Sequence, residues 1–228
     1  MTKWRVLTWN ILGSHRPNLD VVAEVILGYS PDVIALQEIR RKQAKVLARR
    51  LKWRFVWTRK HYPYSPLVWW RAEGLAIATP HQIGEPVTGS ISPDVSTWTF
   101  RHRVAMAVTV TRDGDTLRLA NTHLASHNAD ERIAQAARVV SMVGSRRPAV
   151  VAGDFNSADE VEVLREFRWL DLVDPGGEDS SPAIAPMQRI DYVLVPESAT
   201  VMSRITPIGG EPWHQLSDHL PVLVEFEV

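Results

Sequence analysis

The chain has 228 residues and a formal net charge of zero at pH 7, with 45% hydrophobic and 23% charged residues. These values are typical of one folded domain over residues 1–228, and they exclude a largely disordered chain and a protein that is basic over its whole surface. The lack of cysteine excludes disulfides, thiolate zinc sites and cysteine nucleophiles.

Apolar runs alternate along the chain between the period of strands and the period of helices. Strands are predicted over residues 5–9, 32–37, 55–58, 74–79, 104–111, 116–122, 149–152, 191–195, 201–208 and 222–227. Helices are predicted over residues 19–28, 41–51, 129–143 and 158–167. The Asp113-Gly114 pair predicts a hairpin turn. Hairpins combined with strand–helix–strand units predict a mixed sheet system with helices on the outside.

A basic stretch covers residues 40–60, which hold ten Lys or Arg and no Asp or Glu. Trp53 and Trp57 lie within it, and basic side chains beside aromatic rings suit a polyanion with stackable bases. The stretch is also explained as a solvated helix face whose charges are balanced by acids elsewhere in the fold. The sequence alone leaves both interpretations open, and the first of them predicts nucleic acid as a partner.

Polar side chains recur where the predicted strands end. Each has a structural explanation on its own: Asp154 can cap the following helix, for example, and Asp191 can pair with Arg189. Six strand ends that deliver carboxylates, amides and imidazoles together indicate a site for a hard divalent cation and an anionic substrate. The residues concerned are Asn10, Glu38, Asn121, His123, Asp154, Asn156, Asp191, Asp218 and His219.

Seven short motifs occur in order along these strand ends: "TWNI", "LQEI", "EGLAIATP", "NTHL", "GDFN", "RIDYVLV" and "SDHLPV". From about residue 5 to the end, the chain resembles the endonuclease/exonuclease/phosphatase family, which includes deoxyribonuclease I. The resemblance implies a four-layer α/β sandwich, in which two mixed, mostly antiparallel sheets pack face to face with helices outside. It also implies Mg²⁺-dependent hydrolysis of phosphate esters, mostly phosphodiesters, with Mn²⁺ as an alternative ion.

Chemical roles follow from the residue types. Glu38 is the expected metal ligand, with Asn10 beside it as ligand or phosphate contact and Asp218 as a further ligand. His219 is the expected general acid–base group because imidazole titrates near neutrality, and Asp191 would fix its tautomer. The resemblance assigns Asp154 to the attacking water and Asn156 to a phosphoryl oxygen.

His123 matches the second histidine of the deoxyribonuclease I and sphingomyelinase-like branches of the family. Two imidazoles on opposite sides of the phosphate allow one to serve the water and the other the leaving group. Glu73 stands where the family places a carboxylate partner for His123, although it is also explained as a surface charge next to Arg71. The substrate contacts expected from the sequence are Arg40, Arg41, Arg71 and Asn121.

The sequence therefore predicts a Mg²⁺-dependent phosphodiesterase, with nucleic acid as the leading substrate because of residues 40–60. The alternatives are the same chemistry on a phospholipid head group, an inositol phosphate or a nucleotide, and a nucleic-acid-binding module without catalysis. The chain shows neither a signal-peptide pattern nor an apolar stretch of membrane-spanning length, and a cytoplasmic monomer is expected.

Overall fold

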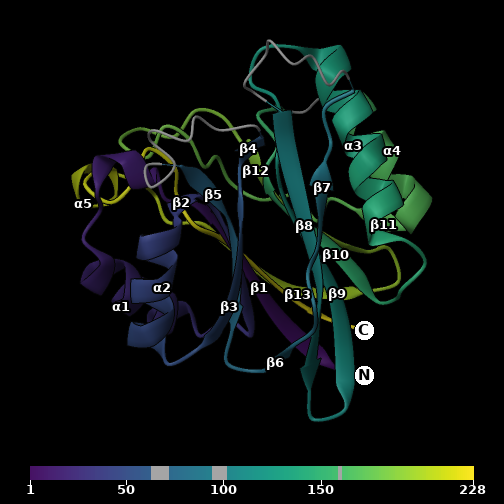
Figure 1. Ribbon diagram of the computed structural model, residues 1–228, viewed down its shortest axis with the longest axis horizontal. Coiled ribbons are helices and arrows are strands. Elements are labelled where there is room, and N and C mark those ends of the chain that lie inside the picture. The colour runs from purple at the N-terminus through teal and green to yellow at the C-terminus, as the bar shows by residue number, and fades with distance from the viewer. Residues whose placement is uncertain (63–71, 94–101, 159–160) are drawn as a thin grey trace.

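The computed structural model describes residues 1–62, 72–93, 102–158 and 161–228. Two β-sheets pack face to face, and helices cover the outer face of each (Figure 1). This is the four-layer α/β sandwich that the sequence predicts.

The first sheet has six strands in the order β13-β14-β1-β2-β5-β3. β1 and β2 are parallel, and the other neighbours are antiparallel. Helices α1 (Leu19–Tyr29) and α2 (Arg41–Leu51) cover its outer face (Figure 1). The strands are β1 (Lys3–Asn10), β2 (Val33–Arg40), β3 (Arg54–Arg59), β5 (Glu73–Thr79), β13 (Thr200–Ile205) and β14 (Val222–Glu227).

The second sheet follows the order β11-β12-β10-β9-β8-β4, with β6 and β7 also paired to β8. β9 and β10 are parallel, and the other pairs are antiparallel. Helices α3 (Ala129–Val143) and α4 (Val161–Glu166) cover its outer face (Figure 1). The strands are β4 (His61–Tyr62), β6 (Gln82–Ile83), β7 (Val87–Ser90), β8 (His102–Arg112), β9 (Asp115–His123), β10 (Ala149–Asp154), β11 (Leu172–Val173) and β12 (Asp191–Pro196).

The core has three apolar layers, one between the sheets and one beneath each pair of helices. Strand β10 shows why, since Val150 and Ala152 face the other sheet while Ala149 and Val151 face the helices. Successive side chains of a strand point to opposite faces, so a strand buried on both faces requires a continuous apolar run.

The predicted elements are largely confirmed, and the differences have local causes. The hairpin turn between β8 and β9 has positive φ at both Asp113 and Gly114, as a tight two-residue turn requires. The strand predicted to reach residue 208 ends at Ile205, and the helix predicted over 158–167 is described only over α4, followed by a 3₁₀ turn at Phe167–Leu170. β4, β6, β7, β11 and the short helix α5 (Glu211–His214) were not predicted, because two to four residues show no period.

None of the helices in the described residues has the length and apolar character needed to cross a membrane.

Candidate active site

Strand register brings three polar residues side by side at one edge of the second sheet. Asp154, the last residue of β10, is paired with His123 at the end of β9 and with Asp191 at the start of β12. Gly153 permits the close approach of β10 to β9 next to this pair, because it has φ +150° and a Cβ there would clash with the carbonyl oxygen of Thr122 on β9. Phe155 is fully buried, which leaves its two polar neighbours on the other side of the chain.

The first sheet contributes Glu38 through a distortion of β2. The pairing of β2 with β5 shifts register between Leu36 and Ile39, so a bulge re-aims the intervening residues. Glu38 lies in this bulge with φ +54°. Leu12 and Asn156, which line a cavity together with Glu38, also have positive φ. Non-glycine residues in this conformation cost about 1–3 kcal/mol each and cluster at functional sites.

The ionisable side chains form a row of alternating charge type from one sheet to the other. Lys60 forms an ion pair with Glu38, and Glu38 Oε1 lies 3.8 Å from His123 Nδ1. His123 Nε2 lies 3.4 Å from Asp154 Oδ2, which is also 3.9 Å from His219 Nε2. The two predicted histidines therefore flank Asp154.

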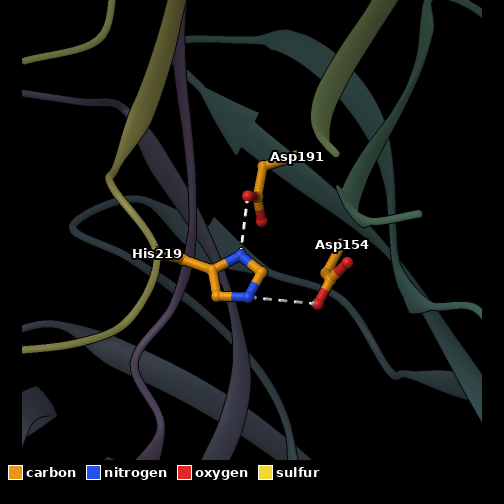
Figure 2. Close-up of side chains that lie close together, drawn as sticks. All are labelled: Asp154, Asp191 and His219. Carbon is orange, nitrogen blue, oxygen red and sulfur yellow. Dashed lines mark hydrogen bonds and ion pairs between the residues drawn. The ribbon is translucent and has the colours of Figure 1, made fainter. Parts of the chain in front are cut away.

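His219 lies between two buried carboxylates (Figure 2). Its Nδ1 is 2.8 Å from Asp191 Oδ2, and the same oxygen accepts a hydrogen bond of 2.6 Å from the hydroxyl of Ser180. Burial alone would lower the pKa of His219, but Asp191 and Asp154 outweigh burial and raise it to about 10. The imidazole is thus held protonated at neutral pH, with Asp191 fixing its orientation.

Asp154 is surrounded by hydrogen-bond donors. Its Oδ2 accepts from Asn10 Nδ2 at 3.0 Å, and its Oδ1 accepts from the backbone N–H of Asn156 at 2.9 Å. Burial raises the pKa of Asp154 to about 6, while the charge of His219 acts to lower it. A carboxyl with this pKa can accept or release a proton near neutrality.

Most of the predicted site residues surround one cavity of about 440 Å³. Asp191 stands behind His219 and does not line it. Asn156 donates through Nδ2 to the carbonyl of Leu124 at 3.0 Å, which fixes its amide at the rim. The predicted residues that line this catalytic cavity are Asn10, Glu38, His123, Asp154, Asn156, Asp218 and His219.

Asn121 lies behind the cavity and is fully buried. Its Nδ2 donates to the carbonyls of Leu36 and Ala76 at 3.0 and 2.9 Å, and its Oδ1 accepts from Gln37 at 2.8 Å. The side chain thus links β9 to the first sheet by hydrogen bonds, and in this position it does not face a substrate in the cavity.

Two further predicted contacts, Arg40 and Arg41, lie away from the catalytic cavity. A third, Arg71, lies outside the described residues. Within the described residues no ion pair joins Glu73 to His123. Burial and the charge of the nearby Glu38 raise the pKa of Glu73. The expected Glu73–His123 pair is thus replaced by Glu38 beside His123.

Several residues that contribute to the site were not predicted. Lys60 is buried against Glu38, and its only sequence signal is that it ends the basic stretch. Ser180 reaches Asp191 from the loop before β12, where nothing in the sequence distinguishes it from Ser181. Arg103 and His127 line the catalytic cavity without any motif to mark them.

In the described residues, one group of three acidic or imidazole side chains could hold a metal ion. Ligand atoms of Asp154, Asp191 and His219 lie within 4.8 Å of one another. Two of these atoms already have protein partners, since His219 Nδ1 lies 2.8 Å from Asp191 Oδ2 and that oxygen also accepts a hydrogen bond from Ser180. The predicted oxygen ligands Asn10, Glu38 and Asp218 line the same cavity.

Residues 7–219 match the model of the Endonuclease/Exonuclease/phosphatase family. No curated protein matches significantly. A family member from Bacteroides vulgatus aligns with a TM-score of 0.80 at 20% identity over all of both chains. The human nocturnin catalytic domain with bound sulfate anion aligns at 0.77 and 22% identity, over 99% of this chain and 93% of that one. A mannosyl-6-phosphatase from Bacteroides thetaiotaomicron aligns at 0.77 and 18% identity, over 99% and 100%.

Proposed function

The chain belongs to the endonuclease/exonuclease/phosphatase family, and from this premise we propose that it hydrolyses phosphodiester bonds in nucleic acid with the help of a divalent cation. Members of this family are phosphoester hydrolases. The observation that carries the proposal is the row of paired charges from Lys60 to His219 in one cavity, in which two imidazoles flank a buried carboxylate and Asp191 supports His219 from behind.

His219 is proposed as the proton donor to the leaving oxygen. Its proton is retained at neutral pH, and Asp191 leaves Nε2 directed toward the cavity. Asp154 is then suited to orient or deprotonate the attacking water, since its carboxyl titrates near neutrality. His123 on the other side of Asp154 and the amide of Asn156 would contact the phosphoryl oxygens.

A hard divalent cation fits the oxygen donors Asn10, Glu38 and Asp218 of this cavity. Glu38 already faces a cationic group, the ammonium of Lys60, and Asn10 and Asp218 line the same cavity. Carboxylate and amide oxygens suit Mg²⁺, with Mn²⁺ as the alternative. A cation bound there would supply neutralisation of charge on the phosphoryl oxygens.

A small substrate is the second candidate. A cavity of about 440 Å³ falls within the usual range for small-molecule sites, and one similar structure is a mannosyl-6-phosphatase. The same row of charges would serve a phospholipid head group, an inositol phosphate or a nucleotide, because it contacts the phosphate rather than the rest of the substrate. A cytoplasmic location and a monomeric state stay predictions from the sequence.

The experiment that separates these candidates is an activity panel with Mg²⁺, with Mn²⁺ and with a chelator. The panel holds single- and double-stranded DNA, RNA, sphingomyelin, inositol phosphates and nucleotides. We expect metal-dependent cleavage of a polynucleotide. Turnover of a small ester alone would favour the second candidate, and no metal-dependent turnover of any substrate would contradict both.

A further inference from the structure

A second cavity, of about 470 Å³, lies between α2 and β3 at the edge of the first sheet. We call it the α2–β3 pocket. It is separate from the catalytic cavity, with which it shares none of the lining residues that the structure describes. Its lining residues are Arg41, Lys42, Lys45, Phe55, Trp57, Arg59 and Ala72.

The pocket carries charge of one sign. Among the described residues its lining includes four cationic side chains and no acid. In the described parts of the chain, none of Arg41, Lys42, Lys45 and Arg59 forms an ion pair or a side-chain hydrogen bond. Four uncompensated cations around one hollow repel one another and produce a positive potential that an anion would relieve.

Helix α2 places two of these cations where they oppose its own dipole. Its first turn contains Arg41 and Lys42 and no acidic residue. The N-terminus of a helix carries partial positive charge and favours acidic side chains, so basic residues there weaken the helix. An anion bound by these side chains would offset their repulsion with the helix end.

The aromatic wall of the pocket is fixed in place. Trp57 Nε1 donates a hydrogen bond of 2.9 Å to the carbonyl of Ile39. The ring also lies against Gly74 on β5, where a Cβ would clash with it. Trp57 and Phe55 are both partly exposed and point to the helix side of β3, because alternate residues of a strand share a face. A ring held in this way loses little conformational entropy when a planar group stacks on it.

Two short connections join the pocket to the catalytic cavity. Arg59 lines the pocket, and the next residue, Lys60, lines the catalytic cavity. Glu38, near the end of β2, lines the catalytic cavity, and Arg41, three residues later at the start of α2, lines the pocket. A linear substrate with a phosphate at the catalytic residues can therefore extend across the ends of β2 and β3 into the pocket.

We infer that the α2–β3 pocket binds one nucleotide of a single-stranded polynucleotide, outside the bond that is cleaved. The four cations hold its phosphate, and its base stacks on Trp57 and Phe55. An unpaired base is required because the bases of a duplex are already stacked on one another. The inference rests on the proposed function, since the nucleotide belongs to the substrate of the catalytic cavity.

The test is the binding of a fluorescein-labelled single-stranded oligonucleotide to the full chain in a chelator, measured by fluorescence anisotropy. The variant Lys42→Gln/Lys45→Gln should bind on the order of 10-fold more weakly at low salt. The slope of log affinity against log salt should fall by up to about 0.7, the value for one phosphate contact on a single strand. The control variant Arg49→Gln/Arg54→Gln changes the charge equally outside the pocket and should bind like wild type.

Base stacking is tested separately with Trp57→Leu and Trp57→Phe. The leucine variant should lose on the order of 10-fold in affinity for the oligonucleotide, whereas the phenylalanine variant keeps a ring and should lose less. An abasic oligonucleotide of the same length should show no difference between the leucine variant and wild type. Thermal unfolding of each variant shows whether the fold is retained.

Equal losses of oligonucleotide affinity in the pocket variant and the control variant would overturn the inference, because they would indicate general charge attraction. Equal effects of Trp57→Leu on the normal and abasic strands, in a folded protein, would overturn the assignment of a base. If wild type binds no oligonucleotide but hydrolyses bis-p-nitrophenyl phosphate with Mg²⁺, the pocket inference fails while phosphoesterase activity stands.

Discussion

The catalytic cavity and the α2–β3 pocket hold charge in opposite ways. In the catalytic cavity, acidic and basic groups alternate and several of them are buried, as Lys60, Asp154 and His219 illustrate. In the pocket, four exposed or partly exposed cations surround two aromatic rings without acidic partners among the described residues. Buried charges require partners, which hold them in one geometry, whereas exposed cations need none. The first arrangement suits proton transfer, and the second suits attraction of a polyanion.

The largest effect is expected from His219→Ala. Loss of the proton donor should lower the rate of phosphodiester cleavage by several orders of magnitude, while oligonucleotide binding in a chelator changes little. The measurements are kcat on an oligonucleotide and anisotropy with the same strand.

The matched control is His214→Ala, an exposed histidine in α5, which should behave like wild type. If His219→Ala kept wild-type kcat, the two regions would not divide chemistry from binding in the way proposed here.

A smaller loss is expected from Asp191→Asn. The variant keeps the shape of the side chain but removes the charge that helps to raise the pKa of His219 to about 10. We expect kcat to fall by up to about 10⁴-fold and the pKa of His219 to drop, as followed by NMR titration of its ring protons. An unchanged pKa would mean that Asp191 does not control the protonation of His219.

The same pKa makes stability depend on pH. His219 has an ordinary pKa of 6.5 that the folded state raises to about 10, so its stabilising contribution is complete below 6.5 and is lost as the pH rises through about 10. The free energy of unfolding, from urea titrations in a chelator, should therefore fall over this range. The fall should be smaller in Asp191→Asn, and an equal fall in both proteins would contradict the assignment. The pKa of Asp154, raised to about 6, places its own transition at lower pH.

The smallest effect concerns salt. Raising the salt concentration should raise the KM for a polynucleotide, because counterions compete with its phosphates at the α2–β3 pocket. The KM for bis-p-nitrophenyl phosphate should change little, because this ester does not reach the pocket. Neutralising Arg41, Lys42 and Lys45 together should reduce the salt dependence for the polynucleotide alone. An equal loss on both substrates would show that the basic stretch is structural.

The sequence was sufficient for the fold and for the residues at the strand ends. Asp154, His123 and Asp191 could be predicted because each ends or begins an apolar strand, and register then places them together. Contacts between distant segments could not be predicted in this way. Ten basic residues occupy positions 40–60, and no local pattern shows that Lys60 is the one that turns inward to Glu38.

Asn121 is the opposite case, a residue that was predicted as a substrate contact but does not line the catalytic cavity. It ends a strand as its neighbour His123 does, yet its amide is directed between the sheets and bonded to Gln37 and to two carbonyls. Two residues apart on a strand share a face, so alternation cannot distinguish them. Whether such a residue reaches the catalytic cavity depends on its depth below the end of the sandwich, and that depth depends on how the two sheets pack.

Metal-dependent phosphodiester hydrolysis is proposed to depend on Glu38 and its neighbours in the catalytic cavity. The most direct test compares Glu38→Gln with wild type, measuring Mg²⁺-dependent cleavage of one oligonucleotide and binding of the same strand in a chelator. In Glu38→Gln, metal-dependent cleavage should be lost while binding is retained. Wild-type cleavage by Glu38→Gln, or cleavage by wild type that is unaffected by the chelator, would contradict this proposal.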